Sequence, residues 1–195
     1  MRHSPGSIMS TPEMRRWVHT GPSHDRPQWY AIYTRARHEK VVARLLGEKG
    51  VETFLPLRET RRPLSPWRFR ITRQPLFPGY VFSRCLLTAE AYDRIRSTAG
   101  VVHIVGTGQG PSPVPNVEIE SIRMLIDQKL DCQPFPYLKV GKRVMVTDGP
   151  LRGLVGRIVR RKSKEYFVVG INLLGRAVAV ELKGSQLEPW LGGRE

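Results

Sequence analysis

Cysteine, acidic residues and long apolar runs are all scarce in this chain of 195 residues. Its two cysteines, Cys85 and Cys132, lie in different segments without a CxxC pair or a nearby histidine, so neither a disulfide framework nor a zinc site is indicated. A reducing cytoplasm is therefore the expected compartment. No apolar run approaches the roughly 20 residues of a membrane span, and residues 1–27 lack the apolar core of a signal peptide, so we expect neither.

The shortage of acidic residues leaves a large positive charge. Only 17 acidic residues oppose 32 lysines and arginines, which gives a formal net charge of +15. This excess favours a polyanionic partner, most often nucleic acid, although a well-solvated basic surface has the same composition. The charge falls in two blocks, +8 over residues 28–112 and +7 over residues 137–195, separated by a stretch of net −2. Two modules that could each face an anionic surface are the simplest interpretation.

The sequence also lacks any recognisable catalytic or phosphate-binding motif. Its five histidines are scattered, without a paired nucleophile or a metal-ligand spacing, and no GxxxxGK[ST] loop is present. We therefore expect a protein that is not an enzyme and that has no catalytic residue, no metal and no cofactor.

Proline and glycine divide the chain into segments. Six of them interrupt residues 1–27, which predicts a disordered tail. Two prolines lie within residues 130–138, where they remove backbone donors and disfavour helix, which predicts a linker. Strand and helix patterns mix before this linker, and only strand patterns follow it. The sequence thus predicts a first domain over residues 28–129 and a second over residues 139–190.

The pattern of the first domain has the order β-α-β-β-α-β-α. The predicted strands are 28–34, 51–57, 74–87 and 101–105, and the predicted helices are 36–49, 89–97 and a third from Asn116. Thr88 and Asn116 are the predicted N-caps of the last two helices. The Phe77-Pro78-Gly79-Tyr80 sequence should bend its strand, because proline cannot donate to a sheet and glycine allows close approach. An α+β fold fits this order, with a ferredoxin-like antiparallel sheet carrying helices on one face.

The second domain shows the period-two alternation of strands. Its strand patterns lie around 144–146, 155–159, 166–171 and 177–182. Four or five short strands in about 55 residues can close into a small SH3-like β-barrel.

Four motifs, in this order, resemble the NusG-like transcription elongation and antitermination factors, which join an N-terminal NGN domain to a C-terminal KOW domain. The motifs are Trp29-Tyr30-Ala31-Ile32-Tyr33 running into His38-Glu39-Lys40, Leu76-Phe77-Pro78-Gly79-Tyr80-Val81-Phe82, Gly141 to Pro150 with Gly153 and Gly156, and Leu174 to Leu182. The His38-Glu39-Lys40 helix start and Phe54-Leu55-Pro56 are further similar to specialised paralogues of the UpxY type. Tyr92-Asp93-Arg94-Ile95-Arg96 on the second predicted helix does not reproduce the polar recognition residues of the related RfaH type.

The resemblance implies a cytoplasmic, monomeric transcription factor that regulates elongation without any cofactor. Family NGN domains bind the β′ clamp helices of RNA polymerase and reach toward the β subunit, which suppresses pausing or termination. Family KOW domains recruit either the termination factor Rho or a small-subunit ribosomal protein. In the RfaH type, the NGN domain also reads the non-template DNA strand.

An exposed aromatic surface is the expected docking site for the clamp helices, because Tyr and Phe combine a large area with few rotatable bonds. The candidate RNA polymerase-binding residues are Tyr30, Tyr33, Phe77, Pro78, Gly79 and Tyr80. About half of the aromatic candidates are expected to lie in the core of the sheet. Tyr80, beside the proline–glycine bend, is the preferred exposed member.

Residues 58–73 form the sharpest charge feature, with a net charge of +5 and with Trp67 and Phe69 interleaved among arginines. Two interpretations stay open. The segment is either an arm that contacts DNA of the transcription bubble through phosphates and stacked bases, or a solvated hairpin loop that keeps the protein soluble. The candidate nucleic-acid contacts are Arg35, Arg37, Arg61, Arg62, Arg68, Arg70 and Arg94.

The second domain carries leucines in predicted loops, which form either a partner site or a local core. The family resemblance favours a partner site at Leu151, Leu154, Leu173 and Leu174. Its many Val and Gly residues disfavour the helical form that the RfaH type adopts, so we expect strands at rest. The rival hypothesis is a ribosome-associated RNA-binding KOW protein, which would bind RNA with a steep salt dependence but leaves the first domain unexplained.

Overall fold

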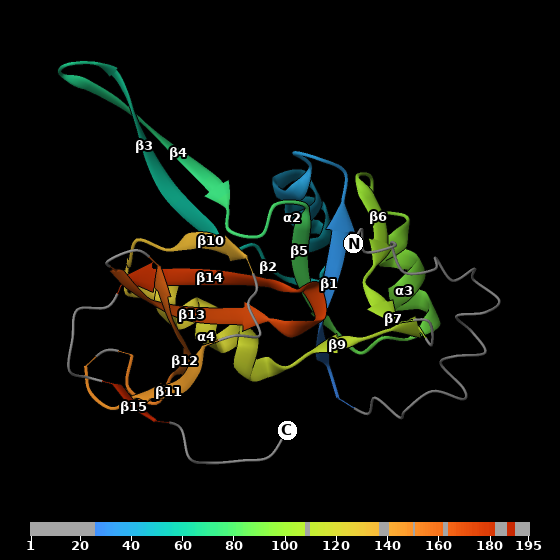
Figure 1. Cartoon of the computed structure of the whole chain (residues 1–195). Coiled ribbons are helices and arrows are strands. Elements are labelled where there is room, and N and C mark those ends of the chain that lie inside the picture. Colours follow the sequence, from blue (N-terminus) through green and yellow to red (C-terminus); the bar gives the residue numbers. More distant parts are fainter. Residues whose placement is uncertain are drawn as a thin grey trace. The chain divides into compact units, whose positions relative to one another are not determined.

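The protein has a mixed α+β structure in which strands predominate (Figure 1). The computed structural model describes residues 26–107, 110–136, 141–149, 151–161, 164–181 and 187–189. All but the last two residues of the predicted N-terminal tail lie outside this part of the chain. The contacts divide the protein into two compact units, one formed by the residues up to Leu55 together with Phe77–Asn116, and the other by Pro56–Leu76 together with the residues from Val117.

A five-stranded antiparallel sheet is the framework of the first unit. Its strands follow the order β2-β5-β1-β6, and β9 also pairs with β1. The bounds are β1 Gln28–Thr34, β2 Glu52–Phe54, β5 Tyr80–Cys85, β6 Val101–Ile104 and β9 Pro113–Val114. Two short strands, β7 (Gly106–Thr107) and β8 (Gly110–Pro111), pair separately. The central strand β1 spans the residues that its aromatic and β-branched side chains predict.

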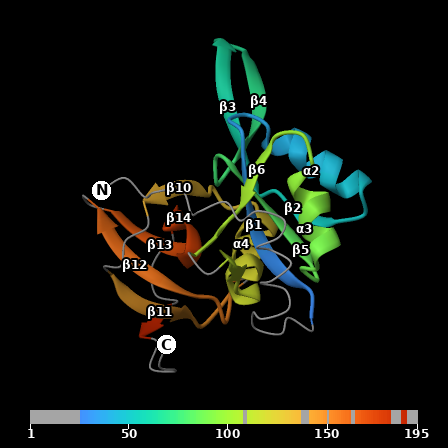
Figure 2. The ribbon, with the colours of Figure 1, turned by 90° about the vertical axis from the view of Figure 1, so that its right-hand side faces the viewer.

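Two helices, α2 (Glu39–Glu48) and α3 (Ala89–Arg96), cover one face of this sheet (Figure 2). Their buried side chains meet those of the strands in one apolar core, formed by Val42, Leu46, Tyr92 and Ile95 of the helices with Tyr30, Ile32, Val81 and Ile104 of the strands. Thr88 caps α3 as predicted, because its Oγ1 accepts the Ala91 N–H at 3.2 Å. Removal of these apolar side chains from water is the main stabilising contribution.

The second unit contains a six-stranded antiparallel sheet with the order β10-β14-β13-β12-β11-β15. The bounds are β10 Gln133–Pro136, β11 Lys142–Val146, β12 Val155–Arg161, β13 Lys164–Ile171, β14 Arg176–Glu181 and β15 Leu187–Pro189, with a 3-10 turn η1 at Asn172–Leu174. The expectation of strands in this region is met. Helix α4 (Asn116–Asp127) leads into this unit and buries Ile119, Ile122 and Leu125.

The segment predicted as a linker over residues 130–138 contains β10, which pairs with β14. Neither proline prevents this pairing, because a strand at the edge of a sheet tolerates residues that cannot donate. The predicted domain limits of 28–129 and 139–190 stay a prediction.

A long two-stranded ribbon, β3 (Leu57–Ser65) with β4 (Arg68–Pro75), also belongs to the second unit. Leu57 pairs with Pro75 at the base, and Ser65 pairs with Arg68 at the turn (Figure 1). The arginine-rich segment is therefore an antiparallel hairpin, with one shift of register between Pro63 and Ser65.

One glycine of the six-stranded sheet occupies a place where a side chain does not fit. A Cβ on Gly156 in β12 would lie 2.6 Å from Cζ of the buried Phe167 ring and 2.8 Å from the Val168 carbonyl oxygen. The close approach of β12 to β13 over this ring therefore requires glycine.

We predict that Gly156→Ala lowers the free energy of unfolding by about 2 kcal/mol, because the added methyl group must displace a buried ring or backbone. The control is Gly47→Ala in α2, where a Cβ meets nothing within 4 Å and where the gain in helix propensity should stabilise by up to about 1 kcal/mol. Denaturant unfolding measures both changes. Equal stability of the two variants would contradict the close packing at Gly156.

Candidate functional site

The central strand β1 presents two chemically different faces. Successive side chains of a strand point to opposite faces of the sheet. Tyr30 and Ile32 face the helices and belong to the core. Trp29, Ala31 and Tyr33 therefore face the other side, where their cross-strand partners on β5 include Phe82 and Tyr80. This second face carries the aromatic residues of the candidate site.

One end of the aromatic face is buried. The Phe82 ring centroid lies 5.7 Å from that of Phe77, in an edge-to-face arrangement, and 6.2 Å from that of Phe54. The ring centroids of Trp29 and Phe54 are 6.3 Å apart, and Trp29 Nε1 donates to Asn116 Oδ1 at 3.2 Å. Edge-to-face rings of this kind stabilise each other beyond their buried area. This end of the face is core.

The other end of the face is open to solvent. Tyr33 lies between two rings, with its centroid 5.3 Å from that of Tyr80 and 5.2 Å from that of His103. The three residues share one register across β5, β1 and β6. Tyr33 is 37% exposed, and the other two are half-buried. We call Tyr80, Tyr33 and His103 the aromatic row.

A tight turn holds the aromatic row in place. Gly79 adopts φ +87 and lies against the Tyr33 ring, where a Cβ would come within 3.3 Å of Cε2. Its carbonyl accepts the Thr34 N–H at 2.9 Å, and its own N–H donates to Glu39 Oε1 at 2.8 Å. Only glycine meets both requirements of conformation and space. Pro78 in the same turn is exposed.

The buried carboxylate of Glu39 joins two of the sequence motifs. Glu39 lies in the first turn of α2 and is only 7% exposed. A carboxylate is expensive to bury unless it accepts hydrogen bonds, and the Gly79 N–H supplies one. The helix that follows β1 therefore fixes the turn that precedes β5.

Two predicted contact residues must be corrected. Tyr30 is 0% and Phe77 1% exposed, so their side chains offer no surface to a partner. Burial raises the pKa of the Tyr30 phenol, as expected for a core residue, and the nearby Cys85 raises it further. Of the remaining candidates, Tyr33 and Pro78 are exposed, and Gly79 and Tyr80 are half-buried. No sequence pattern indicates His103 as a member of the row, because its place beside Tyr33 depends on strand register.

The candidate nucleic-acid residues come from three separate elements. Arg35 and Arg37 are exposed in the turn after β1, where the Arg35 N–H donates to the Gly100 carbonyl at 2.8 Å. Arg94 is exposed on α3. Arg61, Arg68 and Arg70 are exposed on the β3–β4 hairpin of the second unit, and the side chain of Arg62 lies outside the described part of the chain.

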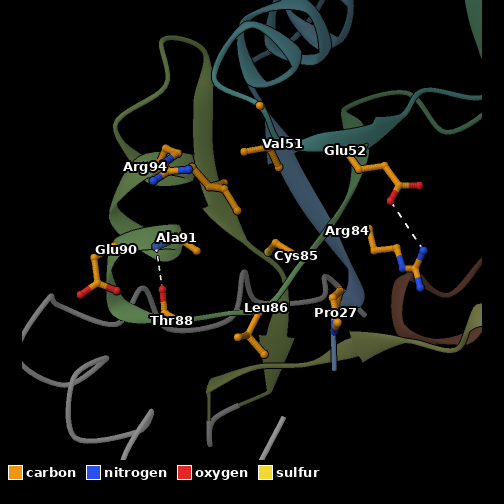
Figure 3. Close-up of a pocket in the computed structure, with 12 residues that line it drawn as sticks. Pro27, Val51, Glu52, Arg84, Cys85, Leu86, Thr88, Glu90, Ala91 and Arg94 are labelled. Carbon is orange, nitrogen blue, oxygen red and sulfur yellow. Dashed lines mark hydrogen bonds and ion pairs between the residues drawn. The ribbon is translucent and has the colours of Figure 1, made fainter. Parts of the chain in front are cut away.

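A cavity of about 490 Å³ opens between α3 and the start of β2 (Figure 3). Its lining includes Cys85, Arg94 and the Glu52–Arg84 ion pair, whose charged atoms are 3.6 Å apart. Burial raises the pKa of the Cys85 thiol to about 11, so the sulfur is protonated at neutral pH and is a poor nucleophile. Among the described residues, no three His, Cys, Asp or Glu side chains are grouped so as to hold a metal.

The leucines of the second unit divide into two pairs. Leu151 and Leu154 are each 4% exposed, in a turn that the Leu154 N–H closes onto the Leu151 carbonyl at 3.0 Å. The prediction that these two form a partner surface is corrected, because both side chains are buried. Leu173 and Leu174 lie on η1 and are half-buried.

The η1 turn is anchored by a buried carboxylate that the sequence did not reveal. Glu118 of α4 accepts the Asn172 Nδ2–H at 2.6 Å through Oε1 and the Asn172 backbone N–H at 3.2 Å through Oε2. Burial raises the pKa of Glu118, and these hydrogen bonds oppose the shift. The two-point contact fixes the loop that carries the half-buried leucines.

Comparison with known proteins identifies the family. Residues 27–123 match the family model described as "Transcription termination factor nusG". Over 178 residues the chain is 28% identical to the transcription termination/antitermination protein NusG of Staphylococcus aureus strain Mu50, covering 83% of this chain and 94% of that protein. The NusG of strain N315 gives the same values. The chain belongs to the NusG-like family.

A solved structure supports the NusG-like assignment. The structure described as "Domain interaction in Thermotoga maritima NusG" matches with a TM-score of 0.53 and 25% identity, covering 84% of this chain and 97% of that one. The resemblance inferred from the four motifs is thereby confirmed. Within the described residues, no helix combines the length and apolar character that crossing a membrane requires.

We predict that Glu39→Ala lowers the free energy of unfolding by about 1 to 3 kcal/mol, because it leaves the Gly79 N–H without its acceptor. Hydrogen exchange at the Gly79 amide should become faster. Glu48→Ala is the control on the same helix, since its ion pair with Arg44 is exposed and should contribute less than about 0.5 kcal/mol. Unchanged exchange at Gly79 in Glu39→Ala would contradict the role of Glu39.

A second prediction concerns acid stability. Burial lowers the pKa of His103 below its usual 6.5. The unfolded chain then binds more protons than the folded one below about pH 6.5, so stability is full above that pH and falls as the pH drops toward the lowered pKa. His103→Phe should keep the ring contact with Tyr33 and flatten this dependence. Denaturant unfolding at about pH 8 and about pH 5.5 measures it, and parallel pH dependences in both proteins would refute the prediction.

Proposed function

We propose that this NusG-like protein is a transcription elongation and antitermination factor that binds RNA polymerase and has no enzymatic activity of its own. The five-stranded sheet with α2 and α3 is proposed to be a ferredoxin-like NGN domain, and the six-stranded sheet a KOW barrel. The observation that carries the proposal is the aromatic row, a half-exposed set of rings on an otherwise packed sheet.

The aromatic row suits the docking of a helical hairpin such as the β′ clamp helices. Binding hot spots are rich in Tyr, since its ring buries a large area while its hydroxyl keeps a polar contact. Association costs less when the contact residues are already ordered. Here the Gly79 turn and the buried Glu39 order Tyr33 and Tyr80 before any partner arrives. From this site the domain would reach toward the β subunit and suppress pausing or termination.

The second domain is proposed to recruit either Rho or a small-subunit ribosomal protein. Leu173 and Leu174 are the supporting residues, because they are half-buried on a turn that Glu118 and Asn172 hold in one shape. Non-template DNA is the third proposed partner, with phosphate contacts from Arg35, Arg37 and Arg94 and from the hairpin arginines.

The polymerase contact makes a direct prediction. The double variant Tyr33→Ala with Tyr80→Ala should bind core RNA polymerase at least about tenfold more weakly, since both rings of the proposed contact are removed. The control is Leu86→Ala, which removes a side chain that is 44% exposed outside the aromatic row. Titration of labelled protein with the cognate polymerase measures affinity, and a run-off assay measures pausing.

Wild-type affinity in the tyrosine double variant would contradict the proposed docking surface. Absence of any polymerase binding by the wild-type chain, together with tight and strongly salt-dependent binding to ribosomal RNA, would favour the ribosome-associated alternative.

A further inference from the structure

The β3–β4 hairpin ends in a turn that displays a tryptophan. Pro66 and Trp67 occupy the two turn positions between the paired Ser65 and Arg68. Leu64 is the extra residue of a bulge, where the register shifts between Pro63 and Ser65. Proline fixes its own φ and so restricts the turn, and a bulge adds local twist.

The apolar side chains of this hairpin are unusually exposed. Trp67 is 91% exposed, and Leu64, Phe69 and Ile71 are 63%, 62% and 56% exposed. Single exposed apolar residues are ordinary on a protein surface, but four within eight residues form a patch. We call Leu64, Trp67, Phe69 and Ile71 the hairpin tip.

The charge around the hairpin tip has one sign. Arg61, Arg68 and Arg70 are exposed. Glu59 is the only acidic residue between Leu57 and Pro75, and its carboxylate already pairs with Arg73 at 3.1 Å. Basic charge without a nearby free carboxylate is complementary to a polyanion.

The register distributes these groups over the ribbon. Arg61 pairs with Ile71 and Pro63 with Phe69, so Arg61, Phe69 and Ile71 share one face. Arg70 lies on the opposite face, because neighbouring residues of a strand alternate. Cations are therefore available on both faces of the ribbon and the Phe69 ring on one of them, which suits a flexible strand that wraps around the turn.

We propose that the hairpin tip binds an unpaired nucleic-acid strand, with Trp67 stacked on a base and Arg61, Arg68 and Arg70 on phosphates. Base stacking needs an exposed base plane, which a single strand offers and an intact duplex does not. This inference rests on the proposed nucleic-acid contact of the hairpin and specifies its ligand and its stacking residue.

The experiment titrates the full-length chain into a labelled thymidine oligonucleotide and into a blunt duplex of mixed sequence, at several salt concentrations. Trp67→Ala should weaken binding to the single strand by about tenfold or more and leave the salt slope unchanged. Arg70→Ala should reduce the slope by about 0.7, the effect of one lost phosphate contact. Trp67→Phe should restore most of the affinity, because it keeps a stacking ring.

The matched control is Val117→Ala, which removes a side chain that is 68% exposed on α4. Equal affinities of Trp67→Ala and Val117→Ala for the single strand would overturn the proposal. An equal loss on the duplex would also overturn it, in favour of groove binding. A loss of polymerase affinity in Trp67→Ala with unchanged oligonucleotide binding would overturn it too, and would indicate that the hairpin tip contacts the polymerase and not nucleic acid.

These outcomes are separable from those of the proposed function. Oligonucleotide binding is measured without polymerase. Wild-type polymerase affinity in the tyrosine double variant would therefore not affect the conclusion about the hairpin tip. Likewise, unchanged oligonucleotide binding in Trp67→Ala would not contradict the proposed polymerase contact.

Discussion

The hydrogen bond from the Gly79 N–H to the buried Glu39 carboxylate is the constraint on which the candidate site depends. It links the first turn of α2 to the Phe77-Pro78-Gly79-Tyr80 turn, forty residues apart in sequence. Without it the turn would lose the acceptor that fixes Gly79 against the Tyr33 ring, and the aromatic row would lose its order. The His38-Glu39-Lys40 helix start and the Phe77-Pro78-Gly79-Tyr80 turn, which are separate motifs in the sequence, are therefore joined in the structure.

The same strand serves stability on one face and the proposed binding on the other. Tyr30 and Ile32 of β1 pack under the helices, while Tyr33 on the opposite face stands in the half-exposed row. A site built on a central strand is held more rigidly than one on a loop, which lowers the cost of ordering it on binding. The hairpin tip differs from this site, because its exposed rings are held by a short, proline-restricted turn and not by the central strand of a sheet.

Residue preferences over a few positions are sufficient to predict many of the helices and strands, but they are insufficient to predict which residues form the candidate site. The strand at Gln28–Thr34 and the Thr88 cap follow from residue preferences, which act over a few positions. Whether an aromatic residue is buried depends on its face and its cross-strand partners. The sequence therefore predicted that some of the aromatic candidates are core but could not select Tyr30 and Phe77. The place of His103 beside Tyr33 depends on the same register. The strand at Gln133–Pro136 was missed because its prolines indicate a linker, whereas an edge position tolerates them.

The central claim is that the open end of the β1 aromatic face contacts RNA polymerase. The most direct measurement places a photoreactive phenylalanine analogue at Tyr33, with Val41 on the exposed surface of α2 as the comparison site. After irradiation with the cognate polymerase, the subunit linked to each position is identified by mass spectrometry. We predict a cross-link from position 33 to the β′ clamp helices and little from position 41. Cross-links of equal yield at both positions, or none to β′ from position 33, would contradict it.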